Sequence, residues 1–119
     1  MRMKEFLAKG LKKTLKLKKN RNIENYEITA ETAKQMLRLD KNIILVDVRS
    51  KNEYDEGHIN GAISIPNYEL LNKLYLLNSI DSTIIVYCQK GGRSKKAVKE
   101  LRQIGYINSY SVIDGLTQW

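Results

Sequence analysis

Cys88-Gln89-Lys90-Gly91-Gly92-Arg93-Ser94 is the stretch around which the rest of this chain is organised. The residues just before it, 83–87, form a β-branched apolar run that predicts a buried strand. The residues after it, Lys95 to Ile104, have the periodicity of a helix. A lone cysteine is therefore predicted at the carboxyl end of a strand, a few residues before a helix begins.

The composition of this loop predicts a cradle for an anion. Gly91 and Gly92 allow the backbone to turn its N–H groups inward, and the following helix points its positive end at the same place. A free thiol has a pKa near about 8.5, and a helix N-terminus beside cations lowers it. We therefore interpret Cys88 as a nucleophile rather than a buried structural thiol. Residues Gln89, Lys90, Gly91, Gly92, Arg93 and Ser94 form its predicted anion-binding loop.

The overall composition narrows the class of protein. A chain of 119 residues is the size of one domain. It contains no run near the ~18 to 20 apolar residues that a membrane-spanning helix needs. Its single cysteine cannot form an internal disulfide, so a cytoplasmic location is expected. With one cysteine and one histidine, we expect no metal site, and no cofactor is expected.

The net charge of +8 is concentrated at one end of the chain. Residues 1–21 hold nine of the 21 Lys and Arg and one of the 13 acids, whereas residues 22–119 hold twelve of each. The first part places Met3, Phe6, Leu7, Leu11 and Leu15 at helical spacing among lysines. We predict a basic amphipathic helix in residues 1–22 and a neutral domain in residues 23–119.

The role of this basic segment stays open among several interpretations. Packing of its apolar stripe on its own domain or on a neighbouring copy is favoured, so the oligomeric state is open too. Contact of residues 1–21 with an anionic membrane surface comes next, which would make the protein peripheral there. An acidic partner protein follows, and nucleic acid is disfavoured because residues 22–119 are neutral. Lysines interrupt every candidate apolar core of a secretory signal.

Strand and helix patterns alternate along the rest of the chain. Further strands are expected at 26–28, 43–48, 63–65 and 110–113. Helices are expected from about Thr29 to Leu39, at Glu53–Asp55 with a cap at Ser50 or Asn52, and at 68–77. This alternation predicts an α/β fold with a central, mainly parallel five-stranded sheet and helices on both faces. Sites in such sheets lie beyond the carboxyl ends of strands, where Cys88, Asp47 and Arg49 are placed.

Separated motifs in residues 26–119 resemble the single-domain rhodanese family. They are Val46-Asp47-Val48-Arg49, Glu53-Tyr54, Gly57-His58-Ile59-Asn60-Gly61-Ala62, Cys88-x-x-Gly91-x-Arg93-Ser94, and Asp114-Gly115 ahead of Trp119. The resemblance implies a rhodanese-like fold and a sulfurtransferase. Its cysteine would take a sulfane sulfur from a small donor such as thiosulfate, become a persulfide, and pass the sulfur to cyanide or a thiol. Nothing in the resemblance concerns residues 1–21.

Several other polar residues are candidates for supporting roles. Lys90 and Arg93 are candidates for holding an anionic donor, and for Arg93 a role in bracing the loop is equally favoured. Asp47, Arg49 and Glu53 are expected to form an ion-pair cluster rather than a proton relay. His58 is expected to be a hydrogen-bonded structural residue rather than a partner of the nucleophile.

Two other classes of function remain as alternatives. A phosphatase or arsenate reductase also surrounds an anion with a cysteine and an arginine, but related phosphatases have five residues between them. Here four residues separate Cys88 from Arg93, and the smaller loop suits a single sulfur atom better. The other alternative is a binding module that has kept the fold without catalysis. For a sulfurtransferase, the lack of a second cysteine means that the acceptor is an external thiol or protein.

Overall fold

The computed structural model describes residues 25–119, which build a parallel sheet with the strand order β1-β5-β4-β2-β3. The strands are β1 (Glu27–Ile28), β2 (Ile44–Asp47), β3 (Ile63–Ser64), β4 (Ile84–Tyr87) and β5 (Ser109–Val112). The register places Val46 of β2 beside Val86 of β4, and Val86 beside Ser111 of β5. The predicted five-stranded parallel sheet is confirmed.

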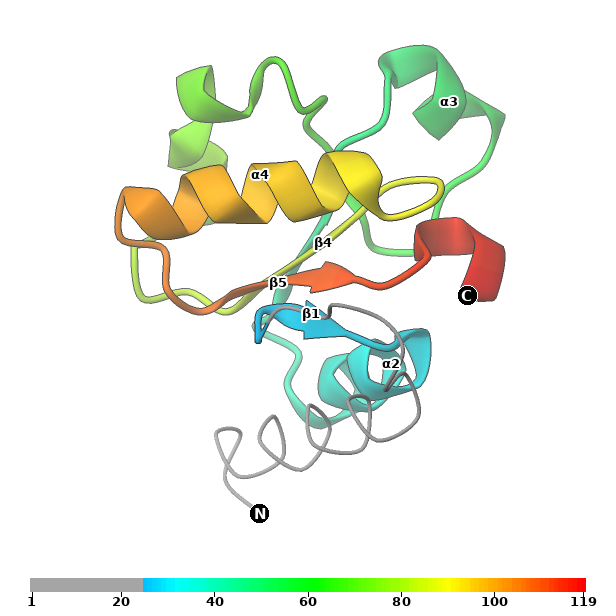
Figure 1. The fold of residues 1–119 in the computed structure, drawn as a ribbon, viewed down its shortest axis with the longest axis horizontal. Coiled ribbons are helices and arrows are strands. Elements are labelled where there is room, and N and C mark those ends of the chain that lie inside the picture. Colours follow the sequence, from blue (N-terminus) through cyan, green and yellow to red (C-terminus); the bar gives the residue numbers. More distant parts are fainter. Residues whose placement is uncertain (1–24) are drawn as a thin grey trace.

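Helices cover both faces of this sheet, as predicted. Helix α4 (Gly92–Gln103) lies over one face and α2 (Ala30–Leu39) over the other (Figure 1). Because side chains alternate along a strand, Val46 and Val86 point to the α4 side, while their neighbours Leu45 and Ile85 point to the α2 side. Each face therefore has its own apolar core, and the central strands are apolar on both sides.

Two of the predicted helix starts are confirmed in detail. Thr29 Oγ1 accepts a hydrogen bond of 3.1 Å from the N–H of Thr32 and caps α2. Ser50 caps the short helix α3 (Lys51–Glu56) through a reciprocal capping box with Glu53, and Gly57 ends it. The second cap also fixes the position of the Glu53 carboxylate, which becomes important at the site.

The prediction of one continuous helix at 68–77 is wrong. The structure has two short 3-10 helices instead, η1 (Leu70–Asn72) and η2 (Leu74–Leu77), joined at Lys73. Neither has a side-chain cap at its start, and an uncapped helix of this length is marginal unless packing supports it. Leu70 and Leu77 reach the core, but Leu71 is half-exposed, so the apolar stripe is narrower than predicted.

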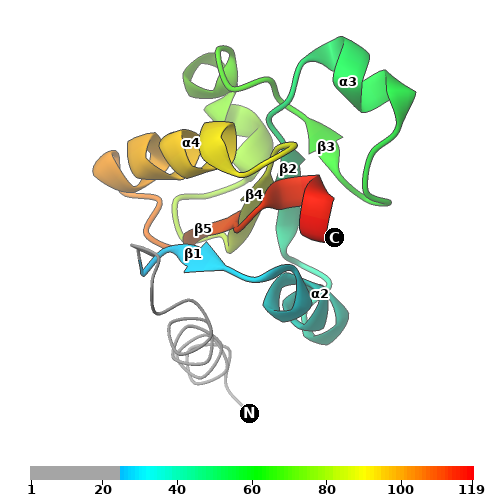
Figure 2. The same ribbon diagram turned by 45° about the vertical axis from the view of Figure 1, so that its right-hand side comes forward.

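Helix α4 begins three residues earlier than the sequence pattern suggests. Gly91 adopts a left-handed conformation with φ of 103° immediately before the helix, so Arg93 and Ser94 belong to the first turn rather than to the loop. Their position places the unpaired N–H groups of that turn beside Cys88. Figure 2 shows this loop between the end of β4 and the start of α4, with the C-terminal 3-10 helix η3 (Gly115–Gln118) nearby.

The amphipathic helix predicted for residues 1–22, and the boundary after it, lie outside the described residues. Among residues 25–119, no helix has the length and apolarity needed to cross a bilayer.

Candidate functional site

Cys88 lies directly after β4 and is almost completely buried, with 1% of its surface exposed. The carboxyl end of β4 is flanked by the ends of β2 and β5, because all three strands run in parallel. The thiol therefore occupies the position at which open parallel sheets place their functional groups.

Hydrogen-bond donors of the loop converge on the Cys88 sulfur. The Gly91 N–H donates to Sγ at 3.1 Å, and the Ser94 N–H donates at 3.4 Å. The Ser94 hydroxyl lies 3.6 Å from Sγ and is held in place by Ser111, whose Oγ is 2.8 Å away. The cradle predicted from the glycines and the helix start is therefore formed around sulfur.

These donors decide the ionisation of the thiol. Burial alone raises the pKa of Cys88, because a thiolate is poorly solvated in the protein interior. The hydrogen bonds from the backbone and hydroxyl of Ser94, and from the backbones of Gly91 and Lys90, outweigh that effect and bring the pKa below the ordinary thiol value. A larger fraction of Cys88 is consequently thiolate at neutral pH, which is the nucleophilic form.

The C-terminal turn holds the outer side of the same loop. The Leu116 N–H donates to the Cys88 carbonyl at 3.0 Å, and the Thr117 N–H donates to the Gln89 carbonyl at 3.3 Å. Gly115 has φ of 53°, and a Cβ placed there would lie 2.2 Å from the Cys88 carbonyl oxygen. The Cys88 and Gln89 carbonyls thus bind this turn, while the N–H groups of Gly91 and Ser94 bind the sulfur.

Glycine is also required at position 91, because the loop passes close to the backbone of the C-terminal turn there. Its φ of 103° is in the left-handed region, and a Cβ there would meet the Asp114 backbone nitrogen at 3.0 Å. Gly92, by contrast, has open space around it and no such constraint. In the sequence, Asp114-Gly115 is recognisable only as part of a motif. The roles of Ser111, Leu116 and Thr117 at the site were missed, because no local pattern connects these residues with Cys88.

The Arg93 guanidinium binds Glu53. Its two terminal nitrogens donate to the two carboxylate oxygens at 2.7 and 3.0 Å, a two-point pair whose side chains are about one-third exposed. This pairing lowers the pKa of Glu53 to about 2 and raises that of Arg93. The geometry is that of a brace between α3 and α4. A direct role of Arg93 in binding a donor stays a prediction.

A second ion pair joins Asp47 and Arg49 in the interior. The Arg49 guanidinium donates to both carboxylate oxygens, the shortest contact being 2.8 Å, and the two side chains are 0% and 5% exposed. Arg49 also donates to the Gly57 carbonyl at 2.6 Å and to Gln89 Oε1 at 3.4 Å. Asp47 and Arg49 therefore pair with each other, whereas Glu53 pairs with Arg93. The Asp47–Arg49 pair connects β2 with α3 and the loop.

His58 lies on the surface and not against Cys88. Its Nδ1 is 2.9 Å from the Tyr54 carbonyl oxygen, and its ring stacks on the Tyr54 ring at 3.7 Å between centres. No hydrogen bond connects His58 with Cys88, and the two residues are not brought together as a dyad. Lys90 is exposed at the rim of the loop, while its backbone faces the sulfur.

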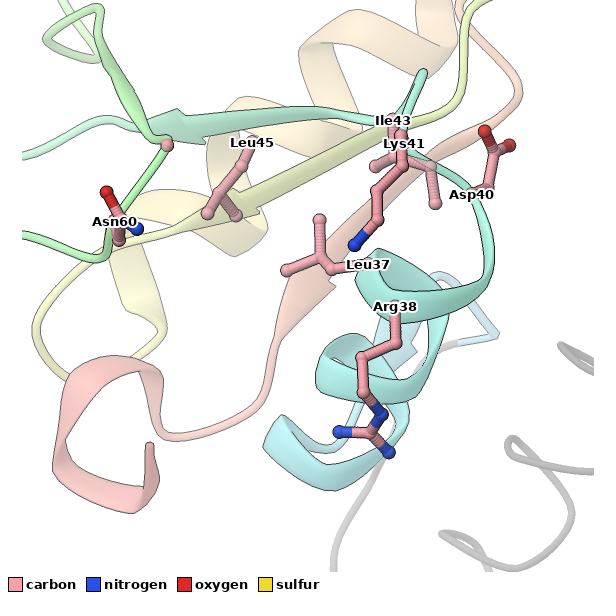
Figure 3. A pocket seen from close by; sticks show the side chains of 8 residues that line it. Leu37, Arg38, Asp40, Lys41, Ile43, Leu45 and Asn60 are labelled. Carbon is pink, nitrogen blue, oxygen red and sulfur yellow. The ribbon is translucent and has the colours of Figure 1, made fainter.

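The pocket shown in Figure 3 is separate from this site. It has a volume of about 350 Å³ and lies where the end of α2 meets the turns before β2 and β3. Its lining, which includes Arg38, Lys41 and Asn60, shares no residue with the Cys88 loop. Among residues 25–119, no group of three or more His, Cys, Asp or Glu side chains is arranged to hold a metal ion.

Comparison with known proteins agrees with this geometry. The rhodanese-like domain matches residues 29–119. An adenylyltransferase and sulfurtransferase, uba4, from Ogataea parapolymorpha is 44% identical over 79 residues, which are 63% of this chain and 19% of that protein. The thiosulfate sulfurtransferase GlpE of Shewanella oneidensis is 30% identical over 79 residues, covering 66% of this chain and 77% of that one.

Solved structures give the same result for the fold. A rhodanese-like domain protein from Staphylococcus aureus superposes with a TM-score of 0.71 at 31% identity, covering 78% of this chain and 89% of that chain. The chain spans between 19% and 59% of the length of several curated relatives that it matches. The similarity to these proteins concerns this domain and not their remaining parts.

Proposed function

This chain belongs to the rhodanese-like domain family, and we propose that it is a sulfurtransferase that carries sulfane sulfur on Cys88. The observation that carries the proposal is the buried Cys88 thiol, whose pKa is lowered by converging N–H and O–H groups. Relatives that are named sulfurtransferases add support.

In the loading step, the Cys88 thiolate attacks the outer sulfur of a donor such as thiosulfate. A bond forms between Sγ and that sulfur, the bond to the sulfonate sulfur breaks, and sulfite leaves with the electron pair. The terminal sulfur of the resulting persulfide is itself an anion at neutral pH. The N–H groups of Gly91 and Ser94 are oriented to stabilise such charge, by the same principle as an oxyanion hole.

In the unloading step, a nucleophile such as cyanide or a thiolate attacks the terminal sulfur, and the Cys88 thiolate leaves with its electron pair. The chain has one cysteine, so no second thiol of its own can take the sulfur. The acceptor is therefore external to residues 1–119: cyanide, a small-molecule thiol or a thiol on another protein.

The proposal is tested by intact-mass measurement after treatment with thiosulfate. We expect the mass to rise by one sulfur atom, to return on addition of cyanide with release of thiocyanate, and not to rise in Cys88→Ser. The proposal fails if neither thiosulfate nor a thiol persulfide adds sulfur to the wild-type chain. Release of phosphate from an aryl phosphate, dependent on Cys88, would instead identify a phosphatase.

A further inference from the structure

We propose that Glu53 is a specificity-determining residue: by holding Arg93 in a two-point ion pair, it disfavours sulfur donors with two negative charges and favours donors whose reacting group carries one negative charge or none. Thiol persulfides are the donor class that fits this description. The inference rests on the function proposed above and concerns the same site.

Most of the cations around Cys88 are already paired. Three of them belong to the site: Arg49, Lys90 and Arg93. Arg49 is buried, and its guanidinium is occupied by Asp47 and the Gly57 carbonyl. Arg93 gives both terminal nitrogens to Glu53. Of the three, only Lys90 is exposed without an ion pair among residues 25–119.

Glu53 is held firmly in its position. Besides binding Arg93, its Oε1 accepts hydrogen bonds from the Ser50 N–H at 3.2 Å and the Ser50 hydroxyl at 3.1 Å. The carboxylate is therefore fixed by the capping box of α3 as well as by the ion pair. Its pKa of about 2 means that it remains charged throughout the physiological range. The charge of Arg93 is therefore offset by Glu53 over the whole physiological pH range.

The two classes of donor differ in the charge of the reacting species. Thiosulfate brings two negative charges toward a thiolate, and this repulsion must be offset by cations at the site. The persulfide group of a thiol persulfide carries at most one negative charge, as RS–S⁻, and it donates its outer sulfur from the neutral protonated form, RS–SH, with which that anion is in equilibrium. The Cys88 thiolate bonds to that sulfur, the RS–S bond breaks, and the thiolate RS⁻ leaves with the electron pair. The persulfide proton stays on the transferred sulfur until solvent removes it.

The test is the rate at which Cys88 is loaded, followed by quenched intact-mass measurement with two donors. One donor is thiosulfate, and the other is the persulfide of mercaptoethanol, which carries no fixed charge. Glu53→Gln removes the negative charge, and glutamine still completes a capping box. Because Arg93 is then free to bind an anion, we expect loading by thiosulfate to become about tenfold faster, and loading by the persulfide to change little.

Two further variants make the test specific. Glu56 is an exposed acid on the same helix, so Glu56→Gln removes an equal charge without touching Arg93, and we expect no gain in thiosulfate loading. In the double variant Glu53→Gln/Arg93→Gln the gain should disappear, since it depends on the freed guanidinium. An equal gain for both donors, a gain in Glu56→Gln, or a gain that persists in the double variant would overturn the inference.

A measurement on the wild-type chain covers the case in which Glu53→Gln folds poorly. If the cations are neutralised as described, the rate of thiosulfate loading should stay level or rise as potassium chloride is added. A steep fall with salt would show an attractive positive field and contradict the inference. The outcome for the proposed function is separate, because that proposal fails only if neither donor loads Cys88.

Discussion

Replacement of Gly115 by alanine tests whether the C-terminal turn sets the properties of the thiol. The new Cβ would lie 2.2 Å from the Cys88 carbonyl oxygen and 2.8 Å from the Gln89 carbonyl carbon and oxygen. All three are backbone atoms, so no flexible side chain can move aside. The turn and the loop must separate, and the hydrogen bonds from Leu116 and Thr117 to the loop must lengthen or break.

The expected loss of stability has two parts. Alanine in the left-handed region costs about 1–2 kcal/mol, because its Cβ crowds the following carbonyl. Loss of two backbone hydrogen bonds adds roughly 1 kcal/mol each. We therefore expect Gly115→Ala to lower the free energy of unfolding by about 3–4 kcal/mol, measured by urea denaturation.

Gly61 provides a matched control for the strain alone. Its φ of 88° is also left-handed, but a Cβ there has nothing within 4 Å. Gly61→Ala should cost only the conformational part, about 1–2 kcal/mol, and should leave the site intact.

The same pair of variants separates an effect on the site from an effect on stability. Separation of the loop from the turn withdraws the N–H groups of Gly91 and Ser94 from Sγ, so the pKa of Cys88 should rise in Gly115→Ala and stay constant in Gly61→Ala. The pKa is measured from the pH dependence of alkylation by iodoacetamide. Equal losses of stability in the two variants, with an unchanged pKa in both, would refute the reasoning.

Three other substitutions have definite expected outcomes. Asp47→Asn leaves the buried Arg49 guanidinium without its counter-charge, so we expect the free energy of unfolding, measured in urea, to fall by about 3 kcal/mol. A fall of less than about 0.5 kcal/mol, as for an ordinary surface substitution, would contradict the importance of the buried pair. Ser94→Ala removes a hydroxyl that lowers the pKa of Cys88, so the alkylation midpoint should move to higher pH, and no movement would contradict that role. Glu53→Gln should cost about 1 kcal/mol at neutral pH, since the ion pair is partly exposed, and unfolding is again followed in urea. The pKa of Glu53 is about 2 in the folded protein and lies below its ordinary value of 4.5, so this stabilisation is present above pH 4.5 and is lost as the pH falls toward 2. If the difference in unfolding free energy between the wild type and Glu53→Gln grew in acid, the ion pair would not be its cause.

The sheet and the loop were predictable because their causes are local. A buried parallel strand needs a β-branched apolar run, as in residues 84–87, and the turn after it needs glycine where φ is positive, as at Gly91. The same holds for the cap at Ser50, which depends only on the residues of its own helix. Such features are contained in a few consecutive residues, so the sequence predicted them, although it left the cap open between Ser50 and Asn52 and placed the start of α4 three residues late.

The features that were missed depend on residues far apart in the chain. The direction of Arg93 is decided by Glu53, which is 40 positions earlier, and a motif fixes where an arginine stands but not where it points. The support of the loop by Leu116 comes from the 3-10 helix η3, which follows β5 and lies 28 positions after Cys88 in the chain. The helix prediction for residues 68–77 was wrong for a related reason. The spacing of its leucines fits a helix, but packing in the folded protein buries only some of them.

The burial of Cys88 bears on the choice of its reaction partners. With 1% of the residue exposed, little of its surface is open to an approaching molecule. A sulfane sulfur is a terminal atom, whereas each sulfur of an ordinary disulfide carries a substituent on its far side. For the sulfurtransferase proposed above, this low exposure favours donors that end in sulfur over the formation of mixed disulfides.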